Sequence, residues 1–563
     1  MHPTGGRAIL VDDESKARPR RGKRVLQWIM FIVFLAAVTL GVVGAVMVRR
    51  AGPILKGRVI ETLSARFDSG VDLDDFHVGL GRGLEVSGDG LRIYPPADVV
   101  AAGADKPLIF IQHFEFYSGL RGLFLKPMHV GTVHVRGLAV NIPPREQRQA
   151  AAGERKPLRG KIKIFVEEIV CDDSRLVIGT LKPGKEPKDF ELRHIVMHDV
   201  GPDLPWQYDA TIVNAIPKGD IHATGTFGPW NTESPGDSAV TGHYTFDNAD
   251  LNPIKGIGGI LSSVGDFTGQ LDRIEVHGTT ETPDFKLDTA NRPVPLHTEF
   301  EAVVDGTTGD TYLHNVKARL GSSNMTASGQ VVNVKGKGHI VDVDVDVPNG
   351  RIQDFLDLAV KTRPVVMTGT VRMKMKLHVP YGKESVAKKM AVKADFGLQQ
   401  IHMTNPKWQD GIDKLSLRAQ GDPKAAKTGA EDVTSQMKGK FTMEAGRLTF
   451  STLTYDLPGA EVRLVGNYSL DGAQFDFHGN LQTDAKLSQM VASGWKSFLL
   501  KAVDPFFTKD GKGAQIPIAI TGTKDAPKFG LDLKHKGEDE RDGAAAAQEP
   551  GAKPVPPTKA ASH

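Results

Sequence analysis

One spacing recurs in three stretches of the chain and constrains its fold more than any other feature. Residues 216–225, 320–329 and 457–466 each run from an aliphatic residue through two spacers and a small residue to alternating apolar residues, and each ends in glycine. A second pattern, a glycine five residues before a proline, occurs in 278–287 and in 522–531. Repeated supersecondary units stack into elongated architectures. Here the alternation indicates that each unit is built of strands.

The alternation also predicts two chemically different faces. Residues 341–347 read Val-Asp-Val-Asp-Val-Asp-Val, which places valines on one face of a strand and aspartates on the other. We therefore predict a mainly β chain that forms an elongated, curved antiparallel sheet, a repeating groove with short helical interruptions. The side chains expected on its apolar side are Ile274, Val276, Val341, Val343, Val345, Val347, Met373, Met375, Leu377, Val379, Ile516, Ile518 and Ile520.

An apolar sheet face of this kind must be covered, and the periodicity leaves two ways open. The face packs on itself or on helices as an ordinary sandwich core. Alternatively, it lines the concave side of a curved sheet and forms a groove for acyl chains, since large exposed apolar surfaces usually mark binding sites.

The N-terminal region carries a candidate membrane anchor. Residues 25–48 contain no charged side chain, and at about 1.5 Å per residue they are long enough to cross a hydrocarbon core of about 30 Å. A cleaved signal peptide is the alternative, but its apolar core is usually shorter. Residues 1–24 form a basic stub, and the excess of basic residues before the span predicts a cytoplasmic N-terminus. The bulk of the chain is then expected outside the cytoplasm.

The remainder divides into three parts. Residues 49–205 are predicted to be a β-rich region that begins with an amphipathic helix at 54–67, which either packs on the first strands or lies on lipid head groups. Residues 206–535 carry the repeats, and residues 536–563 form a tail too poor in apolar residues to order itself. The repeat modules are expected at about 206–290, 296–380 and 391–535, with helical interruptions at 251–264, 350–361 and 485–503 and a charged loop at 145–160.

The chain offers few candidate catalytic residues. Asp342, Asp344 and Asp346 lie in a row along one strand, which does not wrap around a calcium ion. His194 and His198 have the spacing of a helical metal pair but lack the glutamate of a metalloprotease motif, so we interpret them as solvated or hydrogen-bonded. Cys171, the single cysteine, stands beside two aspartates that disfavour its thiolate. We predict no enzyme activity, no cofactor and no metal. The net charge of +3 gives no reason to expect a nucleic-acid partner.

Several segments resemble the AsmA-like family, the AsmA/TamB-type envelope proteins of Gram-negative bacteria. The resemblance rests on the span followed by the 54–67 helix and the strands of 71–94, on residues 437–450 leading into 457–466, and on Ile516-Pro-Ile-Ala-Ile-Thr-Gly-Thr-Lys-Asp-Ala-Pro527. It covers most of residues 25–535 and is less clear over 96–205.

The resemblance implies an inner-membrane, single-pass anchor and a periplasmic β-groove without a catalytic motif. It also implies a role in moving phospholipid for outer-membrane biogenesis, with the inner membrane, phospholipid and other envelope proteins as partners. The main alternative is a non-catalytic assembly or scaffold factor for outer-membrane proteins, whose sheet edge pairs with a client strand. A β-rich hydrolase is a third option, for which the chain offers no motif.

Overall fold

The computed structural model describes residues 56–532 with gaps. The residues left out within this range are 58, 62, 65–68, 81–82, 120–124, 126–127, 145–163, 180–186, 202–203, 230–234, 307, 335–336, 362, 383, 429–431, 470–473, 492–512 and 524–525. The predicted stub, membrane span, 145–160 loop and C-terminal tail therefore lie outside the described residues. Within the described part of the chain, no helix is long and apolar enough to span a membrane.

The described residues form one long sheet of 24 strands, which confirms the mainly β prediction. The strands of its first half are β1 (Val71–Asp72), β2 (Asp75–Leu80), β3 (Leu84–Ile93), β4 (Ile109–Ser118), β5 (Met128–Ile142), β6 (Ile164–Ile178), β7 (Lys188–Val200), β8 (Trp206–Asn214), β9 (Lys218–Phe227), β10 (Ala239–Asp250), β12 (Ile260–Gln270) and β13 (Arg273–Thr282). Those of its second half are β15 (Leu296–Val304), β16 (Thr311–Leu320), β17 (Ser323–Val334), β18 (Gly338–Arg351), β19 (Met367–Val379), β20 (Ala391–Met403), β21 (Ser435–Glu444), β22 (Arg447–Leu457), β23 (Ala460–Ser469), β24 (Phe475–Thr483), β25 (Ala514–Thr523) and β26 (Ala526–Leu531).

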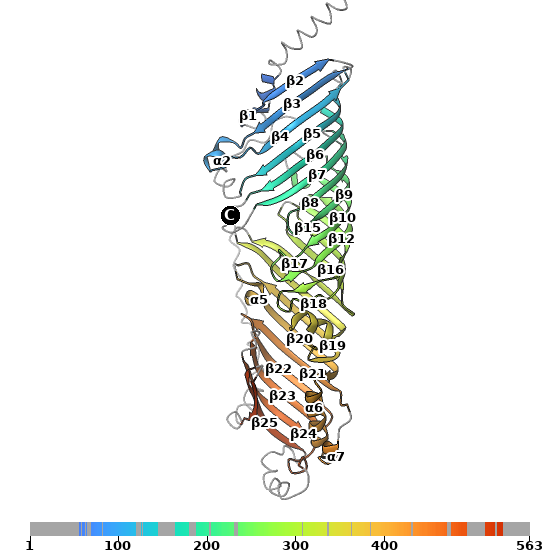
Figure 1. Cartoon of the computed structure of the whole chain (residues 1–563), viewed down its shortest axis with the longest axis vertical. Coiled ribbons are helices and arrows are strands. Elements are labelled where there is room, and N and C mark those ends of the chain that lie inside the picture. The colour runs from blue at the N-terminus through green and yellow to red at the C-terminus, as the bar shows by residue number, and fades with distance from the viewer. Residues whose placement is uncertain are drawn as a thin grey trace, which may run out of the picture.

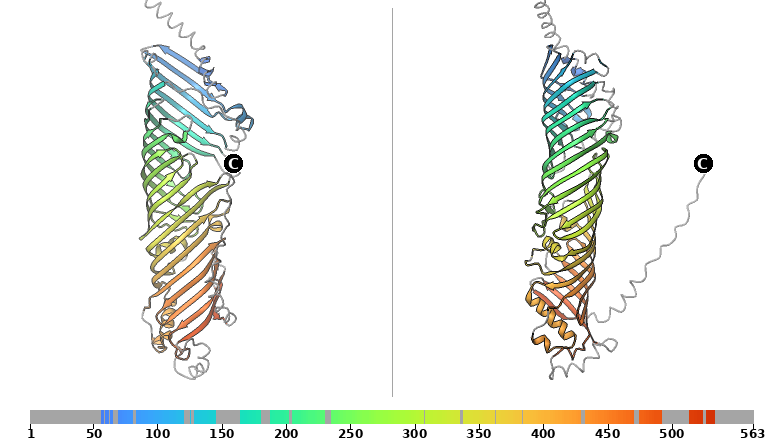
Figure 2. Two further views of the ribbon diagram at one scale, coloured as in Figure 1. Left: turned by 180° about the vertical axis from the view of Figure 1, so that it is seen from behind. Right: turned by 90° about the vertical axis from the view of Figure 1, so that its right-hand side faces the viewer.

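The strands follow one another along the long axis of the molecule in chain order. β1 and β2 both pair with β3, and from β3 onward each strand of the sheet hydrogen-bonds to the next one along the chain. The ribbon accordingly runs from blue to red along its length while the sheet curls around that axis (Figure 1, Figure 2). The arrangement is an elongated stack rather than a set of separate globules.

One pairing departs from the predicted antiparallel sheet. β5 and β6 run parallel, with Val133 opposite Ile169 and Val140 opposite Leu176. Parallel neighbours need a crossover connection of about a dozen residues or more, and residues 143–163 supply that length. The alternating pattern predicts strands and faces but not the direction of a neighbouring strand, so this exception could not be predicted from it.

Within the ranges described above, few helices accompany the sheet. They are α2 (Ala97–Ala101), the 3-10 turn η2 (Pro235–Asp237), α4 (Ile352–Ala359), α5 (Val386–Lys389), α6 (Pro406–Ala419) and α7 (Ala425–Thr428). α4 confirms the interruption predicted at 350–361. α6 was not predicted, although Asn405 accepts a hydrogen bond from the Lys407 backbone at 3.0 Å and Pro406 occupies the first turn, which together are a typical helix start.

The helix predicted at 251–264 is wrong. These residues form a turn, strand β11 (Ile257–Gly258) and the start of β12, and β11 pairs with β14 (Lys286–Leu287) to make a small second sheet, the β11–β14 flap. The apolar residues do have helical spacing. However, Gly256 and Gly259 adopt φ angles of 98° and 123°, which a helix does not contain. Of the helix predicted at 485–503, the described residues 485–491 form bends and turns, and the remainder lies outside the described part.

The glycines that end the three repeated stretches have a common structural reason. A Cβ atom added to Gly225, Gly329 or Gly466 would lie 2.0, 2.1 or 2.1 Å from a carbonyl oxygen of the neighbouring strand. Real Cβ atoms do not approach backbone this closely, so only glycine fits where these paired strands come so near each other. The sequence repeat thus records a repeated close approach of two backbones.

Candidate functional site

The predicted groove residues all lie on one face of the sheet. Val341, Val343, Val345 and Val347 of β18 lie directly opposite Val379, Leu377, Met375 and Met373 of β19. The same face continues to Ile274 and Val276, which pair with Val304 and Ala302, and to Ile516, Ile518 and Ile520, which pair with Leu481, Gly479 and Phe477. We call this side of the sheet the apolar face. The predicted residues are thus carried by strands β13, β18, β19 and β25, far apart along one continuous surface.

The opposite side, the charged face, is lined by cross-strand ion pairs. Lys376 lies 3.1 Å from Asp344, and Lys374 lies 3.6 Å from Asp346. His378 lies 2.6 Å from Asp342 and, by hydrogen bonding to that carboxylate, lowers the pKa of Asp342. The lysine side chains are about three-quarters exposed. The three aspartates therefore face solvent and basic partners, as expected for a solvated strand face.

The apolar face is half-covered by the protein itself. Val347 is fully buried and Val379 is 9% exposed, whereas Val343, Val345 and Met375 are only partly buried. Ile352 and Phe355 of α4 pack on one end of this face around Val347. Ile412 and Leu415 of α6 pack around Leu457 and Ala460. At the N-terminal end, Ile60 and Leu63 pack against Val71 and Leu73, so this part of the predicted 54–67 helix contacts the first strands.

A conventional sandwich core is not present in the described residues. The hydrophobic clusters draw on consecutive strands and the helix beside them, as in the cluster formed by Val347, Val371, Leu398 and Ile401. A sandwich would instead join strands from two sheets in one cluster. Among the described residues, the apolar face is covered in part by the curl of the 24-stranded sheet and in part by a few short helices (Figure 2).

Aromatic rings form a chain on the apolar face of β20–β24, which sequence reasoning missed. Phe441 lies 6.1 Å from Phe396 and 5.5 Å from Phe450, and Phe450 lies 5.6 Å from Phe477, measured between ring centroids. Rings at these separations attract one another. Glycines make room for them, since a Cβ on Gly439 would touch the Phe396 ring at 3.1 Å. The sequence signal for this chain of rings was a glycine two residues from a phenylalanine on the same strand, as in Gly439 and Phe441 and in Phe477 and Gly479.

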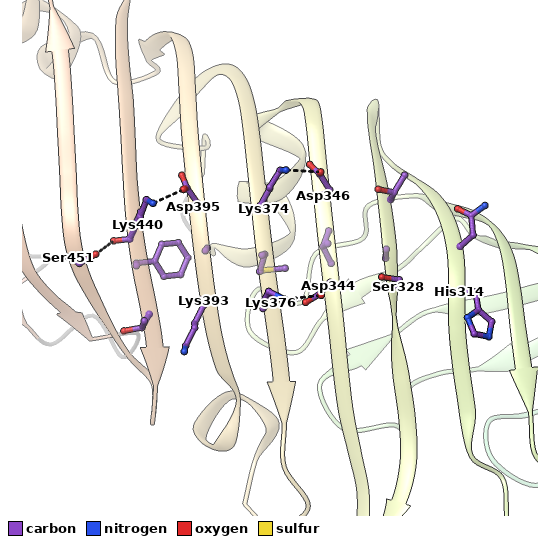
Figure 3. Close-up of a pocket in the computed structure, with 18 residues that line it drawn as sticks. His314, Ser328, Asp344, Asp346, Lys374, Lys376, Lys393, Asp395, Lys440 and Ser451 are labelled. Atoms are coloured by element: carbon purple, nitrogen blue, oxygen red, sulfur yellow. Dashed lines mark hydrogen bonds and ion pairs between the residues drawn. The ribbon is translucent and has the colours of Figure 1, made fainter. Parts of the chain in front are cut away.

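A hollow of about 770 Å³ crosses strands β16–β22 (Figure 3). Two rows of polar side chains line it, one with Asp344, Lys376 and Lys393 and the other with Asp346, Lys374, Asp395 and Lys440. Because these positions alternate with Val345 and Met375 along their strands, the rows project from the charged face and the hollow opens there. Val345 and Met375 border it from between the rows, while the other predicted groove residues do not line it.

The remaining candidate chemistry is inert or structural. Burial, with a smaller contribution from Asp172, raises the pKa of the Cys171 thiol to about 11, which disfavours the nucleophilic thiolate. His194 lies on β7, not on a helix, with its Nδ1 2.7 Å from Asp172, and His198 lies 3.6 Å from Glu168, which confirms their interpretation as partnered histidines. Among the described residues, no cluster of three or more His, Cys, Asp and Glu side chains is arranged to hold a metal ion.

One histidine pair gives a pH-dependent prediction. The hydrogen bond from His478 to Asp532, at 2.5 Å, together with that to Asp476 raises the pKa of His478 and ties β24 to the residue after β26. The raised pKa means that this contribution to stability is complete below about pH 6.5 and is lost as pH rises through the folded-state pKa. Amide exchange, corrected for the pH dependence of the intrinsic rates, reports the free energy of opening of β26. We expect this free energy to fall by less than about 1 kcal/mol as pH rises through the pKa of His478, because the pair is partly exposed.

The Asp532→Asn variant should remove most of this pH dependence. Asp266→Asn, which breaks the exposed pair with His243, serves as the control and should leave β26 unchanged. A pH profile of β26 that is identical in the unmodified protein and in Asp532→Asn contradicts the assignment.

The fold and these two surfaces define a class of protein, a single-sheet extended β protein with one apolar and one charged face. Comparisons of the chain with protein-family models, with curated proteins and with solved structures find no match. The geometry and chemistry of the two faces are therefore the basis on which a function can be inferred.

Proposed function

We propose that this protein binds phospholipid and conducts it passively along the apolar face. In this proposal it is anchored in the inner membrane by residues 25–48, with its N-terminus cytoplasmic and its sheet in the periplasm, and it serves outer-membrane biogenesis as an AsmA-like protein. One observation carries the proposal. A single apolar face runs from β13 to β25 and, over the middle strands, Val343, Val345 and Met375 remain only partly buried.

Hydrophobic energetics support acyl chains as the occupant. Each methylene removed from water contributes about 0.8 kcal/mol, so a pair of acyl chains that rests on valine, methionine and phenylalanine side chains is held outside a bilayer. On β18 and β19 the floor is formed by aliphatic and methionine side chains alone, from Val341 to Val347 and from Met373 to Val379, which leaves few deep traps there to stop a sliding chain. With neighbouring strands about 4.8 Å apart, the twelve strands from β13 to β25 carry this face over about 50 Å.

The proposal contains no catalytic step and no cofactor. The charged face is occupied by ion pairs such as Lys440 with Asp395, at 3.2 Å, and it keeps the outer side of the sheet in water. Direction of movement is assigned to a lipid gradient or to partner proteins.

Lipid analysis of the purified protein tests the proposal. We expect the full chain, extracted in a mild detergent and washed extensively, to carry phospholipid at about one molecule or more per chain by mass spectrometry. Photocrosslinking groups at Val343 should label that lipid, whereas the same group at Asp344, on the charged face, should not. A lipid-free protein that yields no crosslink from Val343 contradicts the proposal.

The alternative, an assembly factor for outer-membrane proteins, is favoured by a different feature. Among the described strands, β26 pairs only with β25, so its other edge is open to a client strand. Crosslinks from residues 526–531 to an outer-membrane protein, without lipid at Val343, support this second function.

A further inference from the structure

Four hydroxyl side chains interrupt the apolar face at one place. Tyr244 of β10, Ser263 of β12, Thr280 of β13 and Thr298 of β15 lie on consecutive strands of the sheet. Thr280 is directly opposite both Ser263 and Thr298. Because Thr280 is four residues from Val276 on the same strand, its side chain shares the apolar face. We call these four side chains the hydroxyl row.

The hydrogen bonds within the hydroxyl row leave one donor uncommitted. Ser263 Oγ donates to the carbonyl of Thr279 at 3.0 Å, so Tyr244 Oη, 3.0 Å away, donates to Ser263. Thr280 Oγ1 and Thr298 Oγ1 are 2.7 Å apart, and either one is the donor. A hydroxyl carries one hydrogen, so the second threonine of that pair keeps an O–H for an incoming acceptor.

The Thr280–Thr298 pair is the accessible part of the hydroxyl row. The face is filled over Gly278, because the Phe300 ring and the Tyr244 hydroxyl each lie 3.1 Å from the position that a Cβ would take there. Thr280 and Thr298 are only partly buried. Beyond the row the face is closed, since Thr282 is 1% exposed, next to Gly259 at the end of the β11–β14 flap. The hydroxyl row therefore marks the boundary between the closed end and the open part of the apolar face.

We propose that the hydroxyl row binds the ester carbonyl oxygens of an acyl lipid. A hydroxyl pressed against hydrocarbon without an acceptor is unfavourable, and the ester linkage is the part of an acyl lipid that supplies an acceptor next to its chains. The uncommitted threonine hydrogen donates to a carbonyl oxygen, while the acyl chains lie over Val276, the Phe300 ring and their neighbours. This inference rests on the proposed lipid function and adds a fixed position and a preferred linkage to it.

Matched lipids test the inference. The full chain is equilibrated with vesicles of a diester phosphatidylglycerol or of its diether counterpart, which has the same head group and chain length but no carbonyl, and the lipid bound is measured by mass spectrometry. We expect about five-fold greater loading of the diester, the ratio that one net hydrogen bond provides. In the Thr280→Val/Thr298→Val variant, which keeps the side-chain shape, the ratio should fall to about one with diether loading unchanged.

The Thr245→Val/Thr279→Val variant provides the control, because its two threonines lie on β10 and β13, two strands of the hydroxyl row, but on the charged face. It should keep the five-fold ratio. A ratio of one in the unmodified protein, or a ratio that survives Thr280→Val/Thr298→Val, overturns the hydroxyl-row site while leaving lipid binding in place. If neither lipid loads, both this inference and the proposed function are overturned.

Discussion

Replacing Met375 with glutamate is expected to lower phospholipid loading at least about ten-fold while the sheet stays folded. Met375 is partly buried in the middle of the apolar face, between Val345 and Ala394. A carboxylate at this position either contacts acyl chains, at a large desolvation cost, or keeps water on the apolar face where the acyl chains would lie. Ile518→Glu, opposite Gly479 and Leu531, should act in the same way near the C-terminal end. The measurement is bound lipid per chain by mass spectrometry.

The control for these variants places the same charge on the other side of the sheet. Thr442 is exposed on the charged face and lies opposite Lys393, so Thr442→Glu adds an acceptor for a basic side chain. Loading should be unchanged in this variant. If Met375→Glu and Ile518→Glu load as much lipid as Thr442→Glu, with circular dichroism spectra that match the unmodified protein, the apolar face is not the lipid site.

Replacing Gly329 with alanine is expected to destabilise the sheet by about 3 kcal/mol or more. The new Cβ would lie 2.1 Å from the Asp342 carbonyl oxygen and 2.8 Å from the Val343 Cα, so β17 and β18 must move apart. Gly225→Ala and Gly466→Ala meet equally close backbone contacts and should behave alike. Hydrogen exchange measured by mass spectrometry should show the loss of protection first in the two strands that flank each site, since a stacked array opens locally.

Gly397→Ala is the matched control for the glycine series. It also lies within a strand, β20, but an added Cβ there has nothing within 4 Å. Its stability should change by less than about 0.5 kcal/mol. A Gly329→Ala variant as stable as Gly397→Ala would show that the neighbouring strand relaxes freely and that the repeated glycine has another cause.

The predicted faces and the observed strands agree because both follow from the two-residue period. Val341–Val347 and Met373–Val379 were assigned to one apolar side from alternation alone, and the register pairs them one to one. α4 was likewise predictable, since Ile352, Phe355 and Ala359 share a helical face. α6 was not predicted although Asn405 and Pro406 signal a helix start, because the segments on both sides of it alternate as strands do.

Other parts of the molecule depended on contacts that no local pattern contains. The 251–264 segment has helical spacing, but it pairs with β10 and β13 and its glycines take positive φ, so tertiary pairing overrode local preference. The parallel β5–β6 pair depends on a crossover between the two strands. The hydroxyl row joins three strands and a tyrosine from a fourth, and its members are unremarkable serine, threonine and tyrosine when read along the chain.

The sequence by itself determined that this protein is a long β sheet with one apolar side, because side-chain direction along a strand depends only on odd or even position. It also determined where two backbones must touch, because glycine is the residue that permits that contact. Only the tertiary structure decided which strands are neighbours, how the sheet curls, which stretches of the apolar face the helices and the β11–β14 flap cover, and where hydroxyl groups meet. Those features arise from register and strand order, and both are set by pairing between strands rather than by the residues of any one strand.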